Sequence, residues 1–314
     1  MRFVTIAALA GLVWLPACGG GSPTTPAAPT PAPASLTIVS AETEAPVAGA
    51  SVTVAGRALS SDASGRVQLP ERPPTGAFVD VVAAGFLDRQ TLFRSGTTQL
   101  SLWPRVASSG LTEDFTANVV YTSASAPAGG PVGESPLERL RPGVAMATLV
   151  ATPEILGDRS ALRALEDAAG QVGMATQGAI AYVVSGARPG AGTSFDVRVD
   201  PGDALCRSGQ TRAYFRGRFV GDEIIGGQIV FCSLSTARTT TAAHEVGHSL
   251  GLQHSNASRD LMFGTFVRGR ATSLTPREGL TVRLMLQRRG GNRFPDNDRG
   301  VTVSGARSRV TVCE

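Results

Sequence analysis

The chain holds all three of its histidines in one stretch, HEVGHSLGLQH at residues 244–254. Residues four apart lie on one face of a helix, so His244 and His248 can both direct an imidazole nitrogen at one metal ion. Glu245 follows the first histidine, where a carboxylate can act as a general base on a metal-bound water. Gly251 allows the positive φ that ends a helix, and the returning chain brings His254 to the same metal.

This ligand set predicts one catalytic Zn2+ ion. Three neutral nitrogen ligands leave a fourth position for water, which is the arrangement of catalytic rather than structural zinc. We expect zinc to activate its water and polarise a scissile carbonyl, and Glu245 to carry the proton of the water to the leaving amine. A five-residue HExxH occurs by chance on exposed helices, but here the glycine and the third histidine also fall in register.

The pattern HExxHxxGxxH resembles that of the metzincin metallopeptidases, and the similarity extends past the third histidine. That family places a methionine-containing turn beneath the ligand imidazoles, and Met262 stands in the matching position. Ser255 directly after the third histidine, together with Leu261-Met262, is most similar to the matrixin branch. The resemblance is dense over residues 239–264 and implies a zinc metalloendopeptidase.

The residues after the methionine depart from the family pattern. Some metzincins carry a tyrosine there as a further metal ligand or oxyanion donor, and matrixins tend to carry tyrosine and then proline. This chain has Phe263 and Gly264 instead. The resemblance therefore implies no tyrosine ligand and a differently shaped wall beside the scissile bond.

The residues before the motif predict a mixed sheet with helices. Apolar runs predict strands at residues 143–151, 179–184, 194–199, 213–220 and 224–231. Asp158 is expected to cap a helix over 158–177, and the metal-binding helix to begin near 236–239. This order matches the metzincin catalytic domain. We therefore predict a zincin-type domain over residues 110–287, followed by an Arg/Gly-rich C-terminal segment over 288–314.

The last strand before the metal-binding helix is expected to border the cleft. An exposed strand edge can hold an extended peptide through main-chain hydrogen bonds. We hypothesise that residues 226–231 align a polypeptide substrate across the zinc. Burial of this strand in the middle of the sheet would remove the hypothesis.

Residues 36–104 predict a small antiparallel β-sandwich. Short apolar alternations between Gly, Pro, Ser and Asp clusters occur at residues 36–39, 50–54 and 78–82. The pattern of residues 46–54, 61–67 and 83–86 resembles carboxypeptidase regulatory-like domains. A spacer role is expected, with substrate or wall binding as the alternative. The whole chain is thus predicted to be α+β, a sandwich followed by a mixed twisted sheet with an active-site helix.

The beginning of the chain predicts export. A positive start precedes an apolar run over residues 3–15 that is too short to span a bilayer comfortably. Leu15-Pro16-Ala17-Cys18 resembles a bacterial lipoprotein cleavage box. Residues 1–17 are therefore expected to be a signal peptide and Cys18 the lipidated residue, which anchors the protein to a membrane. An ordinary secreted protein is the alternative.

A tether follows the signal peptide, and the rest of the chain carries a small net charge. Residues 18–35, rich in Gly, Pro, Thr and Ala, predict an extended tether, and Gly19 in place of an aspartate favours the outer membrane or the cell surface. Removing Arg2 with the signal peptide lowers the net charge from +4 to +3. The 29 basic residues are all arginine and are scattered among acids, so nucleic acid is not an expected partner. The expected partners are a polypeptide substrate and, through the lipid anchor only, a membrane.

Three cysteines remain beyond Cys18. In an oxidising compartment one pair is expected to form a disulfide. Cys206 with Cys232 would fix the loop before the metal-binding helix, and Cys313 is an alternative partner for either.

Two classes of function fit these features. The predicted function is a zinc-dependent endopeptidase. The alternative is a non-catalytic, zinc-containing surface binding or adhesion lipoprotein. Glu245 favours the enzyme, because a purely structural zinc site needs no general base at that position.

Overall fold

A computed structural model describes residues 34–108, 136–255, 257–293, 295–299 and 305–313. By its contacts the chain divides into Met1–Ala32 and Pro33–Glu314, and all described residues belong to the second unit. The predicted signal peptide, Cys18 and the beginning of the predicted catalytic region lie outside the described residues. Within the described part, no helix has the length and apolar character needed to cross a membrane. Sheets and a few helices together make the fold α+β, as predicted.

Residues 34–108 form two sheets that share one apolar core. The first sheet has the order β4 (Arg66–Leu69), β1 (Ala34–Ser40), β7 (Gln99–Leu102), and the second has the order β3 (Arg57–Ser60), β2 (Ser51–Val54), β5 (Phe78–Val82), β6 (Arg89–Leu92). Every second residue of β2 and β4 is buried, the alternation of a sheet with one packed face. The sandwich is not wholly antiparallel as expected, because β1 pairs in parallel with β7. These two strands are not joined by a hairpin, so no tight turn forces opposite directions.

A larger mixed sheet carries the rest of the described chain. Its order is β10 (Ala181–Ser185), β9 (Met146–Ala151), β11 (Thr193–Val199), β13 (Glu223–Phe231), β12 (Ala213–Val220), β14 (Ala306–Cys313), and β8 (Arg139–Leu140) also pairs with β13. Strands β10, β9, β11 and β13 run parallel, whereas β12 is antiparallel to both of its neighbours. The β12–β13 connection is a two-residue turn that begins at Gly221 with φ 60°.

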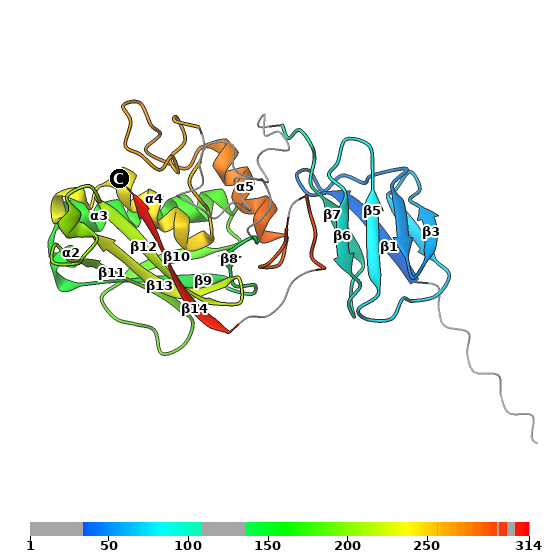
Figure 1. The fold of residues 1–314 in the computed structure, drawn as a ribbon, viewed down its shortest axis with the longest axis horizontal. Coiled ribbons are helices and arrows are strands. Elements are labelled where there is room, and N and C mark those ends of the chain that lie inside the picture. Colours follow the sequence, from blue (N-terminus) through cyan, green and yellow to red (C-terminus); the bar gives the residue numbers. More distant parts are fainter. Residues whose placement is uncertain (1–33, 109–135, 256, 294, 300–304, 314) are drawn as a thin grey trace, which may run out of the picture. The chain divides into compact units, whose positions relative to one another are not determined.

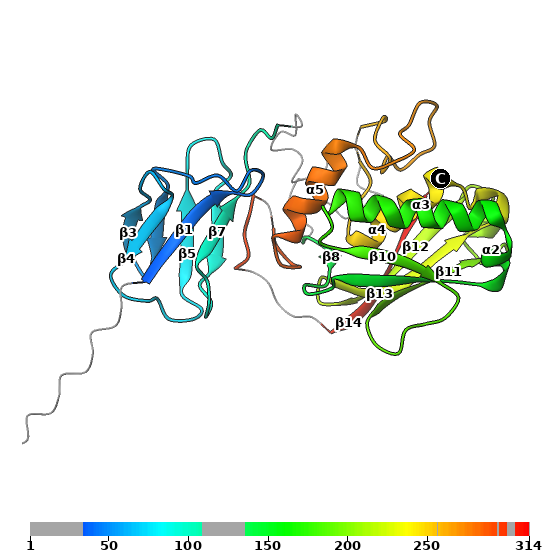
Figure 2. The ribbon, with the colours of Figure 1, turned by 180° about the vertical axis from the view of Figure 1, so that it is seen from behind.

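The helices of this part lie against the sheet. They are α2 (Pro153–Gly157), α3 (Arg159–Ala175), α4 (Thr239–Leu250) and α5 (Pro276–Leu286), with short 3-10 turns at Cys206–Ser208 and Leu234–Thr236. Asp158 caps α3, since its carboxylate accepts the backbone N–H of Ser160 at 2.9 Å and of Ala161 at 2.8 Å. Helices α3 and α4 lie side by side on one face of the sheet (Figures 1 and 2). Helix α4 contacts β12 and β13.

The hypothesis that residues 226–231 align the substrate is wrong. These residues belong to β13, which pairs with β11 on one side and with β12 on the other. Its main-chain groups are used within the sheet and present no free edge. The hairpin places β12 on the side of β13 that faces away from β11. The strand that directly precedes α4 in sequence is therefore not at the edge of the sheet. Residues 288–314, expected as a separate segment, contribute β14 to this sheet.

A buried ion pair follows α5 and contacts the sandwich. The guanidinium of Arg288 donates two hydrogen bonds of 2.7 Å to the carboxylate of Asp296, and neither side chain is exposed. Arg288 also lies over the ring of Trp103 at 4.6 Å. The indole N–H of Trp103 donates to the carbonyl of Leu284 at 3.2 Å. The end of α5 is thus fixed to the last part of the sandwich.

Gly251 is the glycine on which the end of α4 depends. Its φ is 107°, and a Cβ there would meet the carbonyl oxygen of Glu138 at 2.3 Å. We expect Gly251→Ala to lower the free energy of unfolding by about 2–3 kcal/mol in urea denaturation, because it adds a clash to backbone strain. Gly269, with φ 85° and open space around it, provides the matched control. Gly269→Ala should cost about 1 kcal/mol from strain alone; an equal loss in both variants would contradict the close approach at Gly251.

Candidate metal centre

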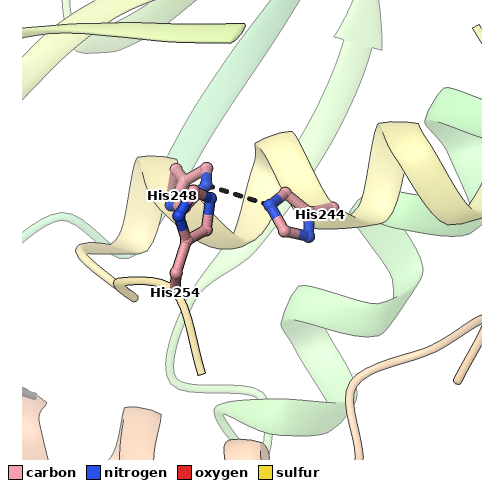
Figure 3. A group of neighbouring side chains, drawn as sticks. All are labelled: His244, His248 and His254. Atoms are coloured by element: carbon pink, nitrogen blue, oxygen red, sulfur yellow. Dashed lines mark hydrogen bonds between the residues drawn. The ribbon is translucent and has the colours of Figure 1, made fainter. Parts of the chain in front are cut away.

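Three imidazoles converge at the end of α4. His244 and His248 lie one turn apart on the helix, and His254 comes from the chain that returns after Gly251 (Figure 3). One nitrogen of each ring lies within 4.8 Å of the others. The Nε2 atoms of His244 and His248 are 3.1 Å apart. The structure therefore brings together all three residues that the sequence predicts as metal ligands.

Backbone carbonyls fix the tautomers of the two helical histidines. Nδ1 of His244 is 2.7 Å from the carbonyl oxygen of Leu261, and Nδ1 of His248 is 2.7 Å from that of Leu252. A carbonyl only accepts, so both Nδ1 atoms carry the hydrogen and both Nε2 atoms present a lone pair. Two lone pairs at 3.1 Å repel unless a cation lies between them. Neutral imidazole nitrogens suit zinc, so the donor set fits this metal.

Burial keeps the three rings in the neutral form that binds metal. It is the main cause that lowers the pKa of His244 to about 3, with the charge of His254 second. It also lowers the pKa of His248 well below its usual value and, with Arg270 and Arg309, lowers that of His254 to about 4. Protons therefore compete weakly with a metal ion at neutral pH.

The predicted methionine turn packs against the helix. A Cβ on Gly247 would lie 2.5 Å from the sulfur of Met262, so the glycine gives this side chain room to pack against α4 where it now lies. The carbonyl of Met262 accepts the N–H of Ser255 at 2.7 Å. Gly264 has a similar place beside the third ligand, because a Cβ there would be 2.8 Å from Nδ1 of His254. The turn thus supports the ligand rings by contact and requires small residues to do so.

Glu278 holds this turn and was not predicted from the sequence. Its buried carboxylate accepts the N–H of Leu261 at 3.3 Å and that of Met262 at 2.6 Å, and it accepts both the N–H and the hydroxyl of Thr275. Burial raises its pKa, although these hydrogen bonds act in the opposite direction. Thr275 and Glu278 form the capping box of α5. The spacing T-x-x-E at residues 275–278 is the sequence signal of the capping box, but it does not indicate the contact with the methionine turn.

The other residues predicted from the sequence are the general base and three cysteines. Glu245 lies on α4 beside His244 and is fully buried. Cys206 and Cys232 are joined by a disulfide, which ties the turn at Cys206–Ser208 to the end of β13, shortly before α4. Cys18 lies outside the described residues.

The family model described as Matrixin matches residues 173–278. This range runs from the last turn of α3, through the three histidines and Met262, to Glu278. The match and the histidine cluster together support a zinc metalloprotease in general.

Solved structures show weaker similarity. The structure of CpGH84D has a TM-score of 0.22 and 11% identity to this chain. The match covers 41% of this chain and 21% of the CpGH84D chain. The crystal structure of metalloproteinase-II from Bacteroides fragilis has a TM-score of 0.32 and 13% identity, over 76% of this chain and 87% of that chain. None of the curated proteins matches the chain. Similarity at this level carries no statement about function.

The lowered pKa values of the histidines predict acid sensitivity of the metal-free protein. The folded pKa values of His244 and His254, about 3 and about 4, lie below the ordinary 6.5, so the unfolded chain binds more protons between these limits. Stability should therefore fall as pH decreases below 6.5, by about 1.4 kcal/mol per pH unit for each such histidine. Urea unfolding of chelator-treated protein from pH 7.5 to 4.5 measures this slope. His254→Asn should reduce the dependence of the unfolding free energy on pH. An unchanged dependence would contradict the lowered pKa of His254.

Proposed function

We propose that the chain is a zinc-dependent endopeptidase, with His244, His248 and His254 as ligands and Glu245 as general base. One observation carries this proposal. Hydrogen bonds from Nδ1 to two backbone carbonyls orient the rings of His244 and His248 so that their Nε2 lone pairs point toward each other. A buried carboxylate directly follows the first of these histidines on the same helix. The match of this part of the chain to the matrixin model supports the same chemistry.

Each residue has a separate task in hydrolysis. Bound zinc would lower the pKa of a water molecule and polarise the scissile carbonyl. Leu252 and Leu261 keep two imidazoles in the tautomer that binds metal. Glu245 accepts a proton from the attacking water and donates it to the leaving amine. Because Glu245 is buried, its charge acts in a medium that screens it less than bulk water does.

We further propose that the protein is exported and anchored by a lipid on Cys18, at the outer membrane or cell surface of a bacterium. The support is the apolar run of residues 3–15 followed by Leu15-Pro16-Ala17-Cys18. The disulfide between Cys206 and Cys232 agrees with an oxidising compartment. Residues 18–35 would then separate the folded part from the membrane.

Glu245→Gln should retain zinc and lose peptide cleavage by about 10²–10⁴-fold, because the amide binds no proton. Metal analysis and cleavage of a mixed peptide library, each with and without a chelator, measure the two effects. Glu166→Gln, an exposed residue of α3, is the matched control and should leave both unchanged. Equal cleavage rates in wild type and Glu245→Gln would refute the role of Glu245. Bound zinc without chelator-sensitive cleavage in wild type would instead favour the non-catalytic surface protein.

Cys18→Ser should move the protein from the membrane fraction of a bacterial host to the soluble fraction, because the acyl chains need the thiol. Mass spectrometry of the N-terminal peptide should show acyl groups in wild type and none in the variant. Gly20→Ser introduces the same side chain without removing the thiol and should remain in the membrane fraction. Equal fractionation of wild type and Cys18→Ser would rule out this anchor.

A further inference from the structure

Strand β14 covers the outer edge of β12. The two strands pair antiparallel over eight residues, from Ala213 opposite Cys313 to Val220 opposite Ala306 (Figure 1). The other side of β12 pairs with β13, so β14 occupies the one side on which β12 can accept a further strand. A strand edge of this kind binds an extended polypeptide through main-chain hydrogen bonds.

This edge borders the metal centre. The guanidinium of Arg309 on β14 donates to the side-chain oxygen of Gln253 at 2.9 Å, and Gln253 directly precedes the ligand His254. Next to the first residue of β12, Arg212 lies over the ring of Phe266 at 4.6 Å. Phe266 belongs to the loop that contacts the same ligand through Gly264. A polypeptide in the place of β14 would therefore pass beside the histidines.

Charged side chains hold the beginning of β14, whereas near its end Val312 packs on the cluster of Cys206, Tyr214 and Val230. The buried carboxylate of Glu138 accepts hydrogen bonds from Arg307 at 2.7 Å and from Arg309 at 2.6 Å. Arg307 also pairs with Asp222 at 2.6 Å and donates to the carbonyl of Gly221 at 3.0 Å. Residues 305–308 and 310 are exposed. The exposed beginning of β14 buries little apolar surface, so it can separate from β12 without unfolding the sheet beneath it.

The reactive residues on α4 are closed to solvent, whereas the third ligand, His254, is half-buried. The exposed fractions of His244, Glu245 and His248 are 1%, 0% and 2%.

We propose that a substrate binds to the outer edge of β12 and that β14 occupies this edge in its place. The enzyme is then latent until β14 leaves β12. The inference rests on the proposed peptidase function. The substrate would be an extended polypeptide segment that pairs antiparallel with β12. It would carry a basic side chain to meet the carboxylate of Glu138, as Arg307 and Arg309 do now.

The first test loosens β14 in the full chain. Arg307→Ala removes the contacts with Glu138 and Asp222 and should raise chelator-sensitive peptide cleavage about tenfold, because a larger fraction of molecules has an open edge. Amide hydrogen exchange in β12 should become faster. Arg188→Ala, which removes an arginine paired with Asp196 between other strands, is the matched control and should change neither quantity. Val310→Pro, which removes a main-chain donor from β14, is a second variant that opens the edge.

The second test does not need activity. A fluorescent peptide with the sequence of residues 305–312 should bind metal-free Arg307→Ala about tenfold more tightly than wild type, because the edge is already open. A scrambled peptide should bind neither protein. The unlabelled peptide should also inhibit cleavage by Arg307→Ala.

The outcomes separate the two proposals. If wild type cleaves peptides and neither variant is faster although β12 exchanges faster, latency is refuted and the peptidase function stands. If no variant cleaves but the peptide binds Arg307→Ala preferentially, the peptidase function fails and the occupied edge stands. Equal peptide binding to Arg307→Ala, Val310→Pro and wild type would refute the occupied edge.

Discussion

The metal centre depends on hydrogen bonds between imidazole Nδ1 atoms and backbone carbonyls. Leu252 can supply its carbonyl to His248 because the chain reverses at Gly251. Leu261 supplies its carbonyl to His244 because Glu278 holds the turn from the other side. The fold itself thus directs both unprotonated nitrogens toward the position where a metal ion would bind.

Local features of this fold could be predicted from the sequence. The spacing of His244 and His248 follows from the helical repeat, and the cap at Asp158 follows from its side chain. The strand at residues 213–220 was predicted with the bounds that the structure gives to β12. These features are determined by neighbours in sequence, through periodicity and capping.

Features that depend on distant residues could not be predicted. Strand β14 pairs with β12 across more than eighty positions, and the alternation of small or apolar residues with Arg and Thr in its sequence does not indicate which strand it joins. The central place of β13 follows from its parallel pairing with β11 and from the hairpin direction, which a single strand sequence does not encode. The sequence around Glu278 indicates only a helix cap. The fold brings its carboxylate to the backbone N–H of Met262.

Helix α5 connects two parts of the molecule that the sequence presents as independent. Near its beginning Glu278 grips the methionine turn, and near its end Leu284 receives the indole N–H of Trp103 in the sandwich. Its eleven residues form a rod about 16 Å long. One short helix therefore supplies contacts both to the sandwich and to the turn beside the ligand His244.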